Sequence, residues 1–471
     1  MKKQKAFIYK CSSCGHEEPK WLGRCPECGE WNTLTETSLQ KSGAKKTHGM
    51  PQTLPLAAVD PMEGSRIGSG IGELDRVLGG GIMKRSSILV GGEPGIGKST
   101  LLLQIAYSAC CGGSLQKGRI LYVSGEESAG QLRLRADRLG LNANKSVMER
   151  IEILCTGNLD EIEIVLNNVN PVLVLIDSAQ TLFSEDAGAV AGTVNQMKFC
   201  SFELISWVKE HDAALFLTAH VTKEGIISGP KTLEHMVDTV LYFEQNDRTS
   251  GLNGAIDCRF LRAAKNRFGS VDEIGIFTMG EKGLSPVEDT GRMFLVKRAE
   301  LNNGLLPPGV AIAAVLEGSR TILVEIQALT IPAKGTISRV FSDKIDSGRV
   351  SRISAALEKH LGKQPGLRLS DQDLYVNVAG GIRITEVGVE LALACALYSA
   401  RTGLSLPADL AIAGELSLTG EIRPVHRLSG RVKTAANLGF SSFLGPVSDQ
   451  PLPGLRSAKD IKIAIKSFFN N

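Results

Sequence analysis

The chain has 471 residues, of which 43% are hydrophobic and 22% charged, the composition of an ordinary globular protein rather than a disordered or fibrous one. Its formal net charge of +3 is too small to identify a partner, so any surface for nucleic acid has to be a local patch. The longest apolar runs, such as 172–176, have the length of a strand and not of a membrane span. The apolar run behind the basic N-terminus, 6–9, is too short for a signal peptide, so we expect a cytoplasmic protein with no membrane partner.

The first motif along the chain is a double C-x-x-C pattern formed by Cys11, Cys14, Cys25 and Cys28. Two such pairs at this separation suit four thiolates around one tetrahedral Zn²⁺ ion, and an all-cysteine ligand set favours a structural site. A segment this short buries too little apolar surface to fold alone, so the metal would supply the folding energy. A redox dithiol is the competing interpretation, but it needs only one pair. We therefore predict a zinc ribbon over residues 1–34.

The rest of the chain divides into three segments that differ in composition and in the pattern of apolar residues. Residues 35–64 are rich in Thr, Ser, Lys, Gly and Pro and predict a linker. In 65–285, strand-like and helix-like runs alternate, which predicts an α/β domain with a parallel sheet and helices on its faces. Residues 287–471 form a further α+β domain. We expect strands at 87–90, 119–123, 151–154, 172–176, 214–217, 239–243, 309–316, 320–327 and 374–378, and helices at 349–361 and 387–400.

A phosphate-binding loop follows the first of these strands. Residues 92–99 read G-x-x-x-x-G-K-S, with an apolar strand before and a helical run after, which is the context that this motif requires. Its glycines let backbone N–H groups face phosphate oxygens, and Lys98 would reach the β- and γ-phosphates while Ser99 holds Mg²⁺. A chance glycine-rich turn is the alternative. The residues expected to bind ATP and Mg²⁺ here are Gly92, Glu93, Pro94, Gly95, Ile96, Gly97, Lys98, Ser99 and Thr100.

Two further apolar runs end at acidic residues. The run 172–176 leads into Asp177, which suits a carboxylate that holds Mg²⁺ at the end of a strand, although a helix cap is the alternative. The run 120–123 leads to Glu126 and Glu127, and we prefer Glu126 as the general base that orients the attacking water. The alternative is that both glutamates stabilise the dipole of the next helix.

A third strand ends at His220, the position expected for a sensor of the γ-phosphate, because ligands bind outside the carboxyl ends of parallel strands. A lone histidine is more often structural, and both interpretations stay open.

The run 72–81 and the phosphate loop together look like the RecA/DnaB-like ATPase superfamily, and the pentapeptide K-N-R-F-G at 265–269 then narrows the resemblance. With the cysteine ribbon ahead and the C-terminal domain behind, the chain resembles the bacterial RadA (Sms) family of DNA repair proteins over essentially its whole length. The resemblance implies a RecA-like core in a homo-hexamer, a DNA-dependent ATPase that translocates on single-stranded and branched DNA. It also implies branch migration of recombination intermediates together with the recombinase RecA.

Lys265 and Arg267 stand two residues apart in this pentapeptide. Alternate residues of a strand face the same way, so both cations would project to one side. Combined with the resemblance, this suggests that they contact the γ-phosphate of a neighbouring subunit, as arginine fingers do. A solvated basic strand is the alternative.

The C-terminal domain is similar to the proteolytic domain of Lon protease, which uses a serine nucleophile activated by a lysine. Aligned by eye, those positions fall near Gly388 and Ser429, and neither side chain can do this chemistry, so protease activity is not expected. The family implies a platform for oligomerisation and DNA binding instead. A basic run that could contact phosphates, or simply be a solvated face, comprises Arg320, Lys334, Arg339, Lys344, Arg349 and Arg352.

Three functions therefore compete: an ATP-driven DNA translocase, an ATP-gated protein-binding scaffold and an ATP-dependent peptidase. The missing Ser–Lys pair counts against the peptidase. ATP hydrolysis stimulated by single-stranded DNA separates the first two, because a scaffold has no need of it.

Overall fold

The structure is a computed structural model. It describes residues 7–11, 17–18, 20–21, 23–26, 29–31, 34–38, 55, 57, 65–112, 115, 118–188, 192–220, 232–245, 258–287, 291, 294–296, 304–333, 335, 338–362 and 367–469. The chain divides into two compact units, Met1–Asp60 and Pro61–Asn471.

The described part of the first unit is a small antiparallel sheet. The strand β1 (Phe7–Cys11) pairs with β2 (Glu17–Glu18) and with β3 (Leu34–Ser38), in the order β2-β1-β3. Between β2 and β3, the turn that follows Cys25 closes through a hydrogen bond from the Gly29 N–H to the Cys25 carbonyl at 2.9 Å.

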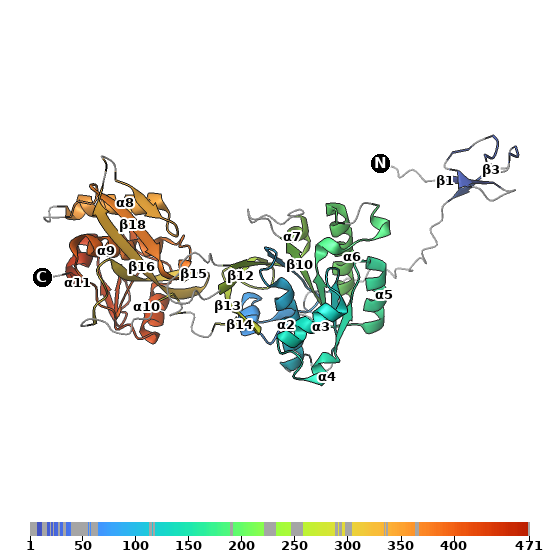
Figure 1. Cartoon of the computed structure of the whole chain (residues 1–471), viewed down its shortest axis with the longest axis horizontal. Helices are drawn as coiled ribbons and strands as arrows, with labels where there is room; N and C mark the ends of the chain where they lie inside the picture. The colour runs from blue at the N-terminus through green and yellow to red at the C-terminus, as the bar shows by residue number, and fades with distance from the viewer. Residues whose placement is uncertain are drawn as a thin grey trace. The chain divides into compact units, whose positions relative to one another are not determined.

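The second unit begins with the predicted α/β domain. Among its described residues, nine strands form one sheet in the order β14-β13-β12-β11-β6-β10-β9-β7-β8. Figure 1 labels β10, β12, β13 and β14 of this sheet. The strands from β8 to β11 are parallel, which confirms the expected sheet, and the three added strands at the β11 edge are antiparallel. The bounds are β6 (Ser87–Gly92), β7 (Ile120–Ser124), β8 (Ile151–Leu154), β9 (Leu173–Asp177), β10 (Ala214–His220), β11 (Thr239–Gln245), β12 (Cys258–Asn266), β13 (Ile274–Gly280) and β14 (Gly283–Pro286).

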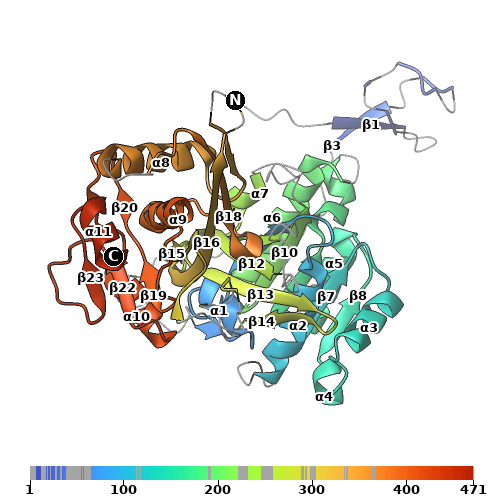
Figure 2. The same ribbon diagram turned by 60° about the vertical axis from the view of Figure 1, so that its left-hand side comes forward.

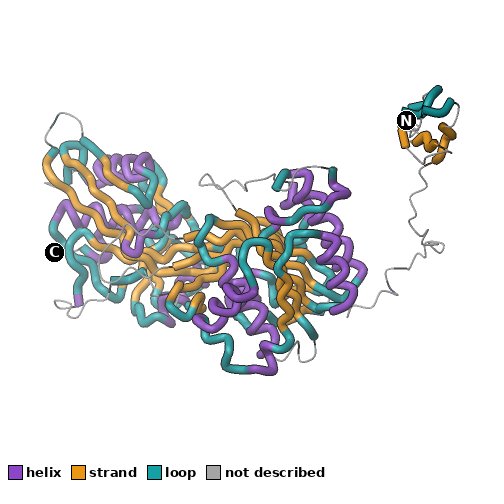
Figure 3. Tube along the Cα trace, turned by 45° about the vertical axis from the view of Figure 1, so that its right-hand side comes forward, coloured by secondary structure: helices purple, strands orange, loops and turns teal. Residues whose placement is uncertain are grey.

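Helices cover both faces of this sheet, which Figure 3 shows as purple segments around the orange strands. One apolar cluster joins the sheet to α1, α2 and α3, and another joins it to α5, α6 and α7. The central strand β6 is buried along its whole length, as expected of a strand that lies between two helical layers. The bounds are α1 (Gly72–Val77), α2 (Lys98–Cys111), α3 (Ala129–Arg138), α4 (Lys145–Met148), α5 (Leu159–Val169), α6 (Val194–Glu210) and α7 (Thr232–Met236), and a two-stranded sheet pairs β4 (Arg66–Ile67) with β5 (Ile82–Met83).

Seven described strands form the sheet of the C-terminal domain, in the order β17-β18-β16-β15-β19-β22-β23. The predicted helix at 349–361 begins two residues earlier, because the Asp346 carboxylate accepts a hydrogen bond from the Arg349 N–H and caps the helix. The bounds are β15 (Val310–Glu317), β16 (Arg320–Pro332), β17 (Val340–Ser342), α8 (Ser347–Leu361), β18 (Gln372–Val378), α9 (Glu390–Thr402), β19 (Leu410–Ile412), β20 (Glu415–Leu416), β21 (Ile422–Arg423), α10 (Leu428–Asn437), β22 (Ser442–Gly445), β23 (Leu455–Ser457) and α11 (Ile461–Phe468).

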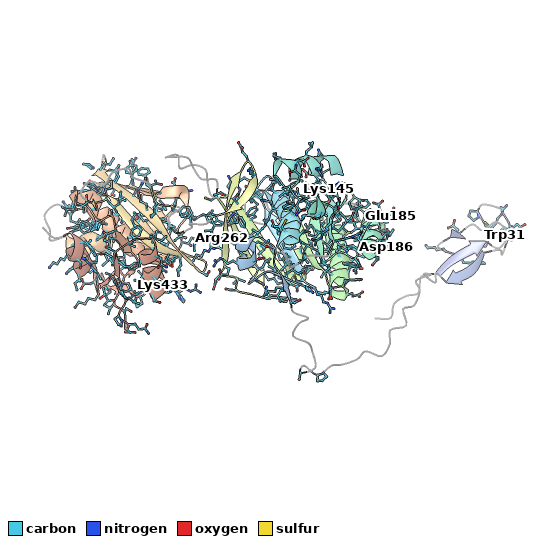
Figure 4. All side chains as sticks on the ribbon, turned by 90° about the horizontal axis from the view of Figure 1, so that it is seen from below. Trp31, Lys145, Glu185, Asp186, Arg262 and Lys433 are labelled. Atoms are coloured by element: carbon cyan, nitrogen blue, oxygen red, sulfur yellow. The ribbon has the colours of Figure 1, made fainter. Side chains whose placement is uncertain are left out.

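The turn between β15 and β16 contacts the first sheet, in the region where Figure 2 shows β12 and β13 beside β15 and β16. Arg320 pairs with Glu73 of α1 at 2.6 Å, and both side chains are nearly buried. Arg262 of β12, labelled in Figure 4, pairs with Glu317 at the end of β15. Removing one partner of a buried pair leaves an uncompensated charge, so loss of either Arg320 or Glu73 alone should destabilise this contact between the two domains.

Within the residues that the structure describes, we find no helix whose length and apolarity would allow it to cross a bilayer.

Candidate active site

The phosphate loop connects the end of β6 to the start of α2. Gly95 and Gly97 have φ angles of +76° and +114°, which residues with a side chain rarely adopt. A Cβ on Gly97 would also lie 2.6 Å from the Met279 side chain. The loop therefore needs glycine at position 97 for its backbone angle, whereas the Met279 atom that a Cβ would meet is the end of a flexible side chain and moves at little cost.

Lys98, the first residue of α2, folds back onto its own loop. Its ammonium donates hydrogen bonds to the carbonyls of Gly92 at 2.7 Å and Glu93 at 3.0 Å. Burial lowers the pKa of Lys98 to about 8, although the nearby carboxylates of Asp177 and Glu126 act in the opposite direction. The cation is thus held by carbonyl dipoles at the place where the sequence predicts that phosphates bind.

Asp177 lies at the end of β9, and its carboxylate is fixed by two hydroxyl groups. The Tyr122 hydroxyl donates to Oδ2 and the Thr218 hydroxyl to Oδ1, both at 2.8 Å. Burial and the neighbouring Asp177 carboxylate raise the pKa of Tyr122 well above its usual value, so the phenol stays a donor. Because both bonds hold the side chain within the site, the alternative in which Asp177 caps a helix does not fit this geometry.

Glu126, Ser178 and His220 come together beside Lys98. The Ser178 hydroxyl donates to Glu126 Oε1 at 2.7 Å, and His220 Nε2 lies 3.5 Å from the same oxygen. His220 Nδ1 lies 3.2 Å from Lys98 Nζ. An ammonium group only donates, so Nδ1 accepts and the proton of the neutral ring is on Nε2, facing Glu126. His220 therefore connects the lysine of the loop to the glutamate.

Glu127 has a different environment. Its carboxylate pairs with Arg135 of α3. Its backbone N–H donates a hydrogen bond to the Ser124 hydroxyl at 2.9 Å. Of the two glutamates, only Glu126 has its carboxylate against His220, which agrees with the preference for Glu126.

Lys265 and Arg267 lie at the opposite end of the sheet from the loop. Near the end of β12, the Lys265 ammonium donates to the carbonyls of Glu234 at 2.8 Å and Val237 at 2.7 Å, around the last turn of α7. Burial and the nearby Arg267 lower the pKa of Lys265. Arg267 pairs at 3.2 Å with Asp238, which also accepts hydrogen bonds from Ser87, the first residue of β6.

The expectation that Lys265 and Arg267 alternate along one strand is wrong. The strand β12 ends at Asn266, and Arg267 lies in the turn that follows. The two cations nevertheless contact the same segment, 234–238, because the turn brings Arg267 back toward Asp238.

The chain was compared with protein-family models and with solved structures. Three family models match parts of the chain: an AAA domain over residues 55–225, a rubredoxin metal binding domain over 9–36, and subunit ChlI of Mg-chelatase over 343–449. Among solved structures, the KaiC-like protein PH0186 from Pyrococcus horikoshii OT3 matches with a TM-score of 0.39 and 21% identity, covering 47% of this chain and 99% of that one.

Curated relatives match nearly the whole chain. DNA repair protein RadA of Treponema pallidum is 55% identical over 461 residues, which cover 96% of this chain and 95% of the relative. The RadA proteins of Bacillus subtilis and Mycobacterium tuberculosis H37Rv are 42% and 41% identical, covering 96% and 94% of this chain and 94% and 89% of the relatives. The chain belongs to the RadA family of DNA repair proteins. The AAA match adds that its core is of the class that hydrolyses nucleoside triphosphates.

For this RadA family member, the rubredoxin match implies a metal such as zinc in the N-terminal unit. Cys25 is buried at a tight turn that suits a metal ligand, and Gly29 next to the last predicted ligand has a φ of +76°. Cys14 and Cys28 lie outside the described residues, and of Cys11 only the backbone is described. Within the described ranges, no three His, Cys, Asp or Glu side chains gather as a metal site.

The Lon-like domain has a buried ion pair where the sequence aligns a protease nucleophile. The Arg431 guanidinium, fully buried, donates to both carboxylate oxygens of Glu386 at 2.7 and 3.0 Å and to the Ala314 carbonyl at 2.6 Å. A Cβ on Gly388 would lie 2.5 Å from Glu386 and 2.9 Å from Arg431. A serine side chain at position 388 would therefore collide with this pair, while Ser429 lies near the start of α10.

The basic run in this domain is not a continuous stripe, and the expectation is wrong for three of its members. Arg320 and Arg349 are only about an eighth exposed, at 12% and 13%, because they pair with Glu73 and Glu390, and Lys344 is buried. Arg339 and Arg352 are exposed, and Lys334 lies outside the described residues.

Several residues of the site were missed by sequence reasoning. Ser178 follows Asp177 directly, and Thr218 stands two residues before His220. Both are neighbours of predicted site residues, but neither belongs to a recognisable motif. Tyr122 reads as an ordinary core residue of an apolar strand. Its role as a donor to Asp177 depends on the pairing of β7 with β9, which no local pattern encodes.

The lowered pKa of Lys98 predicts a pH-dependent affinity for ATP. As the pH rises through about 8, the nucleotide-free protein loses the charge that attracts phosphates. The dissociation constant for ATP should therefore rise roughly eightfold between about pH 7.5 and pH 9, the ratio of the charged fractions at these two values. Isothermal titration calorimetry at both pH values measures this change.

The matched control is Lys98→Arg, whose guanidinium stays charged over the whole range. Its affinity for ATP should change little with pH. A wild-type profile as flat as that of Lys98→Arg would contradict the lowered pKa.

Proposed function

We propose that this chain is a cytoplasmic, DNA-dependent ATPase that works as a homo-hexameric translocase on single-stranded and branched DNA. In this proposal it promotes branch migration of recombination intermediates and acts together with the recombinase RecA. The observation that carries the ATPase part is the convergence of Lys98, Asp177, Glu126 and His220 at the carboxyl ends of neighbouring parallel strands. The DNA part rests on the RadA relatives, which are named as DNA repair proteins.

The residues of the site suit hydrolysis of ATP. Ser99 and Asp177 would hold Mg²⁺, which when bound neutralises charge on the phosphates. Glu126 would orient the attacking water, and its partner Ser178 keeps one carboxylate oxygen in place. Thr100, next to Ser99, is buried and would contribute its backbone N–H to the loop.

Binding of phosphates would change the contacts of Lys98. The ammonium has three protons, and its acceptors in the structure are the carbonyls of Gly92 and Glu93 and the ring of His220. A phosphate oxygen that attracts Lys98 therefore competes with His220 Nδ1. Release of His220 alters the ring that faces Glu126, which gives the histidine a direct means of sensing the nucleotide.

The position of Lys265 and Arg267 supports a role in trans. They contact residues beside Ser87, which is the first residue of β6. The phosphate loop begins at Gly92, which is the last residue of the same strand. Five residues of strand separate these ends by roughly 16 Å, too far for either side chain to reach a phosphate on its own loop. A phosphate contacted by these cations therefore belongs to another copy of the chain, which requires an assembly.

Hydrolysis of ATP in the presence of DNA tests the proposed translocase. Steady-state ATP hydrolysis should rise several-fold when single-stranded DNA is added, because a translocase couples hydrolysis to its track. Lys98→Ala should lower the stimulated rate by at least about 100-fold, since it removes a donor to the transferred phosphate. Hydrolysis that ignores DNA would instead favour the alternative, an ATP-gated scaffold that binds protein partners without translocating.

A mixing experiment tests the role in trans. Arg267→Ala alone should lose most of the DNA-dependent ATPase activity, and so should Lys98→Ala. After subunit exchange in an equal mixture, about a quarter of the sites combine an intact loop with an intact neighbouring arginine, so activity should return to about that fraction. Arg267→Ala with full activity, or a mixture that stays as inactive as its parts, would rule out the finger.

We also propose Zn²⁺ as the metal of the N-terminal unit, held by Cys11, Cys14, Cys25 and Cys28. The purified chain should contain about one zinc ion per molecule, measured by mass spectrometry of the metal, because four thiolates complete a structural site. Cys25→Ser should lose the ion, while the control Cys155→Ser, which replaces an exposed cysteine far along the chain, should retain it. Zinc retained in full by Cys25→Ser would contradict this ligand set.

A further inference from the structure

Arg259 connects the antiparallel edge of the sheet to the phosphate loop. It is the second residue of β12, where it pairs with Gln245 at the end of β11. Its side chain is only 3% exposed, and its Nε–H donates to the Ile96 carbonyl at 3.1 Å. The guanidinium thus reaches into the middle of the loop from a strand that lies 163 positions later in the sequence.

The bond to Ile96 fixes the orientation of one peptide plane. In a planar trans peptide, the carbonyl of one residue and the N–H of the next point in opposite directions. With the Ile96 carbonyl directed at Arg259, the N–H of Gly97 must point away from β12. Gly97 immediately precedes α2, so this N–H belongs to the group of donors at a helix N-terminus that bind phosphate.

The loop has little else in its own sequence to select this orientation. Gly95 and Gly97 flank Ile96, and glycine adopts positive and negative φ angles about equally readily. A rotation of the peptide plane between Ile96 and Gly97 is therefore locally inexpensive, and it would replace the donor with a carbonyl oxygen that repels phosphate. A buried donor on the Ile96 carbonyl removes this freedom, because an unpaired buried carbonyl or guanidinium N–H is costly.

We propose that Arg259 is a positioning residue for nucleotide binding: it holds the Ile96–Gly97 peptide so that the Gly97 N–H is presented to the β-phosphate side of a bound nucleotide. This inference rests on the proposed ATPase function. Arg259 acts through the loop backbone, so its effect falls on the affinity for ATP and ADP and only weakly on the chemical step. Once a nucleotide is bound, its own phosphate oxygens hold the Gly97 N–H in place.

The test compares three substitutions in the full chain. Arg259→Met removes the donor and keeps much of the side-chain volume. Arg259→Gln restores an N–H donor without the charge, and Arg259→Lys restores a donor with it. The matched control is Arg262→Met, three residues along the same strand, where the arginine pairs with Glu244 and Glu317 and not with the loop.

Dissociation constants for ATP and ADP are measured by calorimetry, and kcat and KM from steady-state hydrolysis. For Arg259→Met, both dissociation constants should rise about 10- to 100-fold. This is the loss of affinity expected when the hydrogen bond from a charged group no longer holds the loop in its binding-competent conformation. The value of kcat at saturating ATP should stay within about threefold of wild type. Arg259→Gln and Arg259→Lys should recover part of the affinity, and Arg262→Met should bind ATP like wild type.

Three outcomes overturn the inference: unchanged affinity in Arg259→Met, a collapse of kcat with unchanged KM, or an equal loss of affinity in Arg262→Met. If Arg259→Met does not fold, as judged by its thermal unfolding, Arg259→Gln and Arg259→Lys decide the matter. In that case, dissociation constants for ATP equal to that of Arg262→Met in both folded variants would contradict the role of Arg259, because neither replacement donor should restore the affinity in full. Wild type that binds ATP no better than Lys98→Ala would instead overturn the proposed ATPase function.

Discussion

The pairing of β6 with β10 on one side and β11 on the other determines where every functional group lies. Because these strands are parallel and in register, Gly92 is aligned with His220 and with Phe243, and the phosphate loop emerges at an edge where other strands also end. The same pairing sends the start of β6 to the opposite edge, where Ser87 meets Asp238 and Arg267. One strand thus separates the phosphate loop from the group formed by Ser87, Asp238 and Arg267.

The site at the carboxyl edge is a chain of charge-assisted contacts around one buried cation. Loop carbonyls and His220 satisfy the Lys98 ammonium, and His220 in turn faces Glu126. Burial makes the lysine easier to deprotonate than a surface lysine, so its charge is most strongly favoured when anionic groups are near. A single imidazole ring, that of His220, lies between this lysine and the Glu126 carboxylate.

The strand β12 joins this site to the rest of the second unit. Arg259 at its start contacts the phosphate loop, Arg262 contacts Glu317 of the C-terminal domain, and Lys265 near its end contacts the last turn of α7. The buried pair between Arg320 and Glu73 holds the same two domains together from the side of α1. The three contacts lie along one strand, which pairs with β11 on one side and with β13 on the other.

The sequence by itself determined the features that are local in the chain. The glycines and Lys98 of the loop, the apolar runs ending at Asp177 and His220, and the double cysteine pattern each carry a recognisable spacing, because their chemistry needs neighbours along the backbone. Only the tertiary structure decided which residues meet across strands. It paired Glu127 with Arg135 and set Glu126 against His220, brought Tyr122 and Thr218 to Asp177, placed Arg267 in the turn after β12, and buried Arg320 and Arg349 in ion pairs. These contacts join residues distant in sequence, and burial and pairing depend on sheet order, which no local pattern encodes.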